Sequence, residues 1–171
     1  MTNLKLLPFL VLIGFLIASC AVTSTSRPSQ RILVDPLEYG YVVGHTDGNS
    51  MLLLNEFVRK GDSINDWETL VTRFFGRSGP SAFELATATR NELKRDCPHA
   101  KVSMKKLSDS EYIVEHSHNG CGQWEGHRSV RKIVQGRDGV YIISFDMKNR
   151  AYNANNFSTW GSRIISAKLS E

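Results

Sequence analysis

Hydrophobic and polar residues alternate along much of the chain with the two-residue period of half-buried β-strands. Residues 39–43 follow this pattern, and residues 51–58 form a second strand-like segment after a turn-rich stretch with Asp-Gly at its centre. Residues 68–75 come next, and their threonine and phenylalanine content favours a strand. The first half of the chain therefore predicts three consecutive strands joined by short turns.

The spacing then changes to that of a helix. Residues 76–80 are rich in glycine, serine and proline, and Ser81 and Glu84 have the separation of a capping box, in which each residue bonds the other's backbone. Apolar or small side chains recur at helical spacing up to Cys97, and a residue before proline, here Pro98, avoids the helical region. We expect a helix over residues 81–97, with Cys97 facing inward in its last turn.

The second half of the chain repeats the strand pattern and ends in another helix. Phe157, Trp160 and Ile164 recur on one side of residues 155–169, which predicts a helix that packs on the domain, although Gly161 weakens it by about 1 kcal/mol. The expected fold class is α+β, a mostly antiparallel sheet of about six to seven strands packed by two helices. The strand-like segments of this half are 101–107, 111–116, 129–135 and 140–147.

The first 20 residues have the composition of a secretory signal. Lys5 supplies a positive charge, and the apolar core that follows, residues 6–19, is shorter than the roughly 20 residues that span a bilayer. A charged start, a short apolar core and small residues before a cleavage site are typical of a signal peptide. We therefore expect residues 1–19 to be removed from the mature protein.

The end of this signal resembles the lipobox of bacterial lipoproteins, which signal peptidase II cleaves. Positions 17–20 read Ile-Ala-Ser-Cys, an aliphatic residue and two small residues before the cysteine. The resemblance implies that the Cys20 thiol receives a diacylglyceryl group and that the new amino terminus is acylated, so the lipid bilayer is the first expected partner. Ala21 in the next position implies the outer membrane of a Gram-negative bacterium, at its periplasmic face. The alternative is an ordinary signal with a chance cysteine.

Residues 20–31 are expected to connect the lipid to a single folded domain. They contain serine, threonine, arginine, proline and glutamine with almost nothing to bury, which indicates a flexible tether. The folded periplasmic domain is expected to occupy residues 32–171. Such a length suits one domain with its own core.

Two further segments resemble known families. Residues 56–67, EFVRKGDSINDW, are similar to the motif E-x-V-P-x-G-E-x-x-x-N-W of uncharacterised proteobacterial lipoproteins, although Arg59 replaces the proline and Asp66 the asparagine. Residues 134–169 are similar to the end of PsbP-like domains. That resemblance implies an α/β/α arrangement that mostly serves binding and assembly, and it carries no catalytic residue.

The charge balance excludes one class of partner. The formal net charge is +4 at pH 7 and is spread along the chain. Recognition of nucleic acid requires basic residues that cluster on one face. We therefore expect no nucleic-acid partner.

The cysteines predict one disulfide. Three are present, and lipid occupies Cys20 in this interpretation, which leaves Cys97 and Cys121 as an even pair. Disulfides persist in exported proteins, so we expect these two to be bonded. Two separate buried thiols are the alternative.

The segment 116–127 contains a metal-like set of side chains, His116, His118, Cys121 and His127. A His-x-His pair on a strand directs both rings to one face, and imidazole and thiolate suit zinc or copper. Against this, a disulfide-bonded Cys121 does not ligate metal, and histidines in a polar loop are commonly solvated. We expect no cofactor here and keep a metal site at the three histidines as the alternative.

Two other sets of residues are not expected to carry chemistry. Asp96, Cys97 and His99 resemble an activated thiol in sequence, but a cysteine on the apolar side of a helix indicates burial or a disulfide. A group of acidic residues lacks the spaced ligands of a calcium loop and is expected to form a solvated turn. Its members are Glu56, Asp62, Asp66 and Glu68.

The sequence therefore predicts a membrane-anchored envelope lipoprotein with a non-enzymatic binding or assembly role in the periplasm. The expected partner is an envelope protein or ligand. A metal-binding envelope protein that uses residues 116–127 is one alternative. An envelope hydrolase with a site assembled from distant residues is another.

Overall fold

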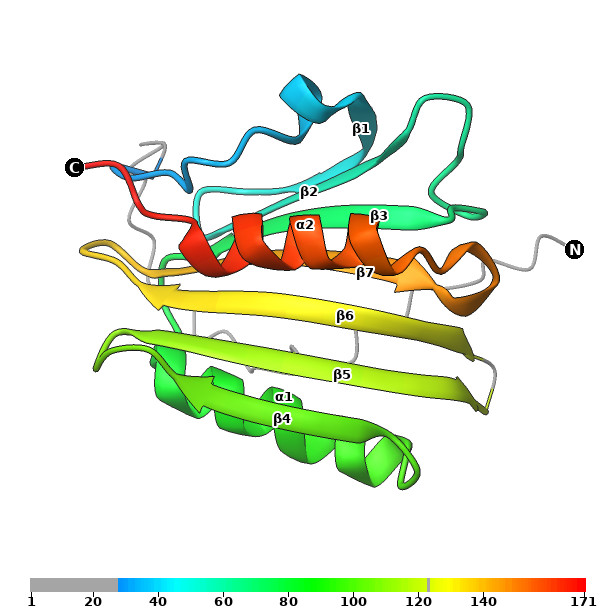
Figure 1. Ribbon diagram of the computed structural model, residues 1–171. Coiled ribbons are helices and arrows are strands. Elements are labelled where there is room, and N and C mark those ends of the chain that lie inside the picture. Colours follow the sequence, from blue (N-terminus) through cyan, green and yellow to red (C-terminus); the bar gives the residue numbers. More distant parts are fainter. Residues whose placement is uncertain (1–27, 123) are drawn as a thin grey trace, which may run out of the picture.

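The computed structural model describes residues 28–122 and 124–171, which form one seven-stranded sheet with a helix on each face (Figure 1). The strand order is β1-β2-β3-β7-β6-β5-β4, and every neighbouring pair is antiparallel. The predicted α+β class, a mostly antiparallel sheet packed by two helices, is confirmed. The elements are η2 (Pro36–Tyr39), β1 (Tyr41–Gly48), β2 (Leu52–Arg59), β3 (Thr69–Gly76), α1 (Ala82–Asp96), β4 (Lys101–Lys106), β5 (Glu111–Cys121), β6 (Trp124–Gln135), β7 (Val140–Lys148), η3 (Asn149–Ala151) and α2 (Ala154–Ser166).

The expected signal, the lipidation residue Cys20 and most of the expected tether lie outside the described residues. None of the described helices is long and apolar enough to cross a membrane.

The first predicted strand begins too early. Residues 36–39 form the short 3₁₀ helix η2, because the Asp35 side chain accepts the Leu37 N–H and Gly40 ends the turn with a left-handed φ of 79°. Strand β1 then runs to Gly48, through most of the stretch 45–50 that was expected to be a turn. The turn itself is short because the Asn49 side chain accepts the N–H groups of the residues two and three positions later.

The segment between the fifth and sixth strands was expected to be a long loop, and this expectation is wrong. β5 extends to Cys121 and β6 starts at Trp124, so the two strands form one long hairpin paired almost to its tip. Backbone pairing does not depend on side-chain polarity, and Gly120 and Gly122 take the positive φ angles that the end of the hairpin requires. The histidines of this segment therefore lie on strands.

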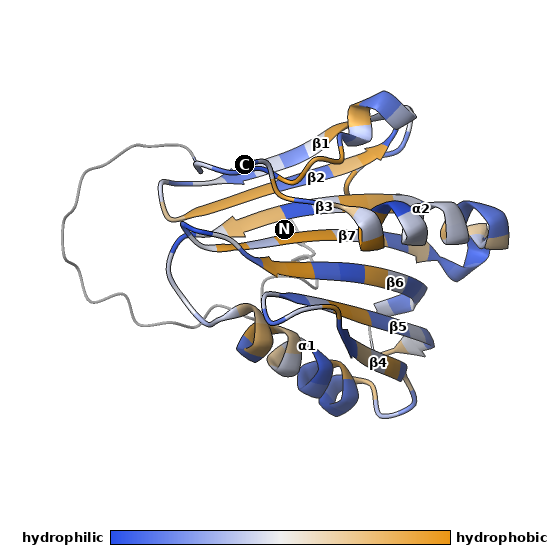
Figure 2. Ribbon diagram, turned by 60° about the vertical axis from the view of Figure 1, so that its left-hand side comes forward, coloured by the Kyte–Doolittle hydropathy of each residue, from blue (hydrophilic) through white to orange (hydrophobic). Residues whose placement is uncertain are grey.

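Both ends of α1 are formed as its sequence predicts. The Ser81 hydroxyl accepts the Glu84 N–H at 3.3 Å, and the Glu84 carboxylate accepts the Ser81 N–H at 2.8 Å. Cys97 is the C-cap, where its N–H donates to the Leu93 carbonyl. α1 packs on β4, β5 and β6, and Figure 2 shows that its last turns are largely hydrophilic.

α2 packs on the other face of the sheet, over β6 and β7 (Figure 1). Trp160 is 1% exposed and stacks on Phe145 of β7 with 5.1 Å between ring centroids, so the predicted inward stripe is confirmed. The helix ends at Ser166, earlier than expected, because the buried Lys132 ammonium binds the carbonyls of Ile165 and Ala167. A cation at a helix C-terminus stabilises these otherwise unpaired carbonyls.

Candidate metal centre

Strand alternation and register bring three histidines together on the α1 face of the sheet. Side chains two residues apart on a strand share a face, so His116 and His118 lie on the side where Tyr112 and Val114 of β5 contact the α1 core. His127 of β6 lies directly opposite His118 in the ladder. Cross-strand neighbours have Cβ atoms about 4.5–5.5 Å apart, and diagonal neighbours such as His116 and His127 remain within reach.

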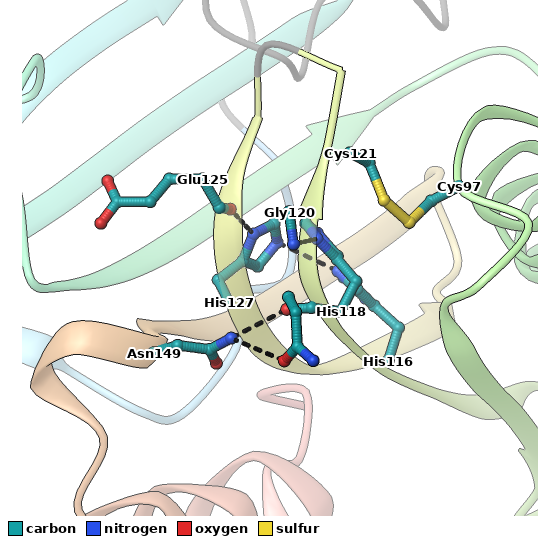
Figure 3. The surroundings of a disulfide bond; sticks show 9 residues. Cys97, His116, His118, Gly120, Cys121, Glu125, His127 and Asn149 are labelled. Carbon is teal, nitrogen blue, oxygen red and sulfur yellow. Dashed lines mark hydrogen bonds between the residues drawn. A yellow bond between two sulfur atoms is a disulfide. The ribbon is translucent and has the colours of Figure 1, made fainter.

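The rings of these three residues, the histidine cluster, are in mutual contact (Figure 3). One nitrogen of each ring lies within 4.8 Å of a nitrogen of the other two. The Nε2 atoms of His116 and His127 are 3.0 Å apart. Around a tetrahedral zinc ion with Zn–N bonds of about 2.0–2.1 Å, two ligand nitrogens lie about 3.3 Å apart, so this pair is already close to a metal-binding separation.

Backbone groups orient two of the rings. The Nδ1 of His127 lies 3.2 Å from the Glu125 carbonyl oxygen, and because a carbonyl only accepts, Nδ1 carries the proton and Nε2 keeps its lone pair. This is the arrangement that commonly fixes a metal-ligating histidine. The Nδ1 of His118 accepts the Gly120 N–H at 3.2 Å, so a metal ion at this nitrogen would replace that hydrogen bond.

Burial keeps two of the rings neutral. His116 and His118 are 7% and 6% exposed. Desolvation, with smaller contributions from the neighbouring His127 and from Arg131, lowers the pKa of His116 to about 2. Desolvation and His127 lower the pKa of His118 to about 4. Metal binding requires the neutral imidazole, and the expectation of solvated histidines is wrong because the long hairpin places them under α1.

The predicted disulfide is present beside the histidine cluster. Cys97 and Cys121 are bonded, with 5.5 Å between their Cα atoms, and connect the end of α1 to the tip of the β5–β6 hairpin (Figure 3). A bonded Cys97 provides no nucleophilic thiolate, and the neighbouring Asp96 carboxylate pairs with Arg95. The Asp96, Cys97 and His99 set therefore has no role as a nucleophile in this structure.

A strip of buried polar residues extends from the histidine cluster across the same face of the sheet. Ser129 of β6 pairs with His116 of β5 on one side and with Asp146 of β7 on the other. Two residues along β6, Arg131 pairs with Ser144 of β7. The same line of paired residues continues through Thr72 of β3 to Glu56 of β2. We call these residues the polar strip. Its members are Glu56, Thr72, Ser129, Arg131, Ser144 and Asp146, all between 0% and 8% exposed.

Glu56 is the member of the polar strip whose environment is predicted wrongly from the sequence. The expectation that it belongs to a solvated turn fails because it lies in β2 and points to the α1 face, where it is 1% exposed. Among the described residues neither of its carboxylate oxygens accepts a hydrogen bond. Burial, with a smaller contribution from Asp146, raises the pKa of Glu56 above its ordinary value.

Comparison with protein-family models finds no match, and comparison with curated proteins finds no similar sequence. The function is therefore inferred from the residues of the site itself.

Proposed function

We propose that this protein is a lipid-anchored envelope protein whose folded domain binds a divalent transition-metal ion through His116, His118 and His127. The single observation that supports metal binding is the meeting of three histidine rings with nitrogens within 4.8 Å of one another. Imidazole nitrogens suit zinc, copper, nickel and iron. The role is binding, in agreement with the non-enzymatic function expected from the sequence.

The chemistry of the donors fits such an ion. His116 and His118 are neutral at physiological pH, and His127 is held with its Nε2 lone pair toward His116. The His116 Nε2 donates a hydrogen bond to that lone pair, so an ion that binds both nitrogens takes the place of this proton, which moves to the His116 Nδ1 or to water. Three protein ligands leave a fourth position of a tetrahedral ion for water or a further ligand. Such a site suits a protein that takes up, holds or hands over a metal ion.

The envelope location is proposed from the sequence. The lipobox-like residues 17–20 support lipidation at Cys20, and Ala21 supports the periplasmic face of the outer membrane. A Cys20→Ala variant should remain an unprocessed, unlipidated precursor, which its larger mass and its partitioning between detergent and water distinguish from the mature lipoprotein. Maturation and partitioning like wild type would contradict the anchor and would leave the metal site untouched.

Competition with a chromogenic zinc chelator tests the metal site. Wild-type protein should withdraw one zinc ion from the chelator, and His127→Ala should weaken binding by about tenfold or more. The matched controls are His45→Ala and His99→Ala, which remove the two exposed histidines outside the cluster and should leave the affinity unchanged. An equal loss in all three variants would contradict the site.

A further inference from the structure

The sulfur atoms of the disulfide and the histidine cluster share one residue. The sulfurs of Cys97 and Cys121 lie within 4.8 Å of each other and of a ring nitrogen of His118. His118 also belongs to the set formed with His116 and His127, whose nitrogens meet the same limit. Two possible donor sets, one with sulfur and one with nitrogen only, therefore overlap at a single ring.

We propose that the Cys97–Cys121 disulfide is a redox control on this metal site. With the disulfide intact, the ion has only the three histidines as side-chain donors. With the disulfide reduced, both thiolates join His118 and a second histidine around the ion. The inference rests on the proposed function in so far as His118 is a ligand in both states.

The backbone around both cysteines allows this change. The Cα separation of 5.5 Å falls in the ordinary disulfide range of about 4.4–6.8 Å. Reduction and binding need the sulfurs to move apart from about 2.0 Å, the length of a disulfide bond, to about 3.8 Å around an ion with metal–sulfur bonds of about 2.3 Å. Cys121 sits at the end of β5, directly before Gly122 with its φ of 58°, and Cys97 is a C-cap, so small rotations at two element ends suffice.

The two sulfurs differ in their access to an attacking thiol. Cys97 is 1% exposed, whereas Cys121 is half-buried at the tip of the hairpin. Thiol–disulfide exchange requires access of a thiolate to a sulfur atom. Attack is therefore expected at Cys121, with Cys97 as the leaving group.

The reductant in this step is a dithiol, such as a protein with two neighbouring cysteines. Its thiolate attacks the Cys121 sulfur, the Cys97–Cys121 bond breaks, and the Cys97 sulfur leaves with the bonding electrons and takes a proton. The second thiol of the reductant then attacks the mixed disulfide and releases Cys121. The dithiol loses two electrons and two protons and becomes a disulfide, and the protein gains two thiols. Binding of a divalent ion releases those two thiol protons.

The two states should differ in metal preference. Thiolates are soft ligands that select zinc and monovalent copper, whereas imidazole alone binds a wider range of divalent ions. Three neutral histidines provide no negative charge to balance a divalent ion. Two thiolates carry two negative charges and balance it completely. Reduction is therefore expected to tighten binding and to narrow its selectivity.

Titration of the purified protein with Co²⁺ separates the two states by spectroscopy. A phosphine reductant keeps the reduced sample free of competing thiol ligands. The reduced protein should bind Co²⁺ about tenfold more tightly or better and show a thiolate-to-cobalt charge-transfer band in the near ultraviolet. The disulfide form should bind Co²⁺ without that band. The Cys97→Ser/Cys121→Ser variant should resemble the disulfide form, with or without reductant.

Each other outcome contradicts a defined part of this account. Equal binding in both forms without the charge-transfer band overturns the redox control and leaves the three-histidine site in place. Binding to neither form contradicts the proposed function as well. If the reduced protein loses its fold, circular dichroism with added Zn²⁺ provides the test: recovery of the folded spectrum supports the proposal, and failure to recover overturns it.

Discussion

The two faces of the sheet differ in the kinds of side chain that they bury. On the α2 face, large apolar side chains fill the space, and the buried Lys132 ammonium binds the carbonyls of Ile165 and Ala167 and pairs with Glu111. On the α1 face, the histidine cluster and the polar strip are buried, and neither carboxylate oxygen of Glu56 has a hydrogen-bond partner among the described residues. Burial of a polar group without a hydrogen bond lowers stability, so the two faces should respond differently when a buried charge is removed.

The largest effect is expected on the α2 face. Trp160 is 1% exposed and contacts Tyr39, Tyr41 and Phe145. Trp160→Ala should lower the free energy of unfolding by about 3–5 kcal/mol in urea denaturation, because it leaves a large cavity. Ile165 lies on the same helix and is 40% exposed, so Ile165→Ala is the control and should lower the free energy of unfolding far less. If Trp160→Ala unfolded at the same urea concentration as wild type, the α2 face would not be the main source of stability.

The next effect comes from the disulfide. Cys97 and Cys121 are 24 residues apart, and a disulfide that closes a loop of this size stabilises by about 2–4 kcal/mol. Calorimetry should show a lower melting temperature after reduction. The Cys97→Ser/Cys121→Ser variant should melt like the reduced protein and should not respond to reductant. An unchanged melting temperature after reduction would mean that the bond contributes nothing to the fold.

A buried charge on the α2 face should be costly to remove. Lys132→Met keeps much of the volume and leaves the carbonyls of Ile165 and Ala167 without their shared donor. The free energy of unfolding should fall by about 1–3 kcal/mol in urea. An exposed basic residue on the same sheet, Lys105, provides the control as Lys105→Met, with a change within about 0.5 kcal/mol. A stabilised Lys132→Met protein would show that partnered charges on this face are not favourable.

The matching change on the α1 face should have the opposite sign. Glu56→Gln removes a buried charge that has no hydrogen-bond partner among the described residues, so stability at neutral pH should rise by about 1 kcal/mol. The pH dependence carries the same information. The folded pKa of Glu56 is raised above 4.5, so wild-type stability is full below that pH and falls as pH rises through the higher folded pKa.

Glu56→Gln should therefore make the free energy of unfolding depend less on pH in this range. The measurement is urea unfolding at pH values from about 4 to about 8, which extends upward from the ordinary carboxyl pKa. A Glu56→Gln protein that is less stable at every pH would show that the carboxylate makes a favourable contact.

Local patterns were enough to predict the fold class, the two long helices and the presence of seven strands, although not the bounds of every strand. The capping-box spacing of Ser81 and Glu84 predicts where α1 begins, and the spacing of Trp160 and Ile164 predicts which side of α2 is buried. The end of α2 could not be predicted in the same way. It depends on Lys132, which is more than 30 residues away in sequence and reaches the helix only when the sheet is assembled.

The candidate site was only partly predictable for the same reason. The His-x-His spacing places His116 and His118 on one face, which the structure confirms. Their meeting with His127 depends on the register of a hairpin whose polar residues suggested a loop. Gly120 and Gly122 were the available signal, because a turn centred there pairs His118 with His127. The burial of Glu56 had no comparable signal, because a single charged residue in the predicted strand 51–58 does not show which face of the sheet its side chain joins.

The most direct test of a metal site on the α1 face is the state of the individual histidine rings. Long-range ¹H–¹⁵N NMR spectra of the ¹⁵N-labelled protein, recorded with and without one equivalent of Zn²⁺, report each ring nitrogen separately. The account predicts that Zn²⁺ shifts the ring signals of His116, His118 and His127, that His127 binds through Nε2 with Nδ1 still protonated, and that His45 and His99 are unaffected. Unchanged signals for the three clustered rings, or shifts confined to His45 and His99, would contradict it.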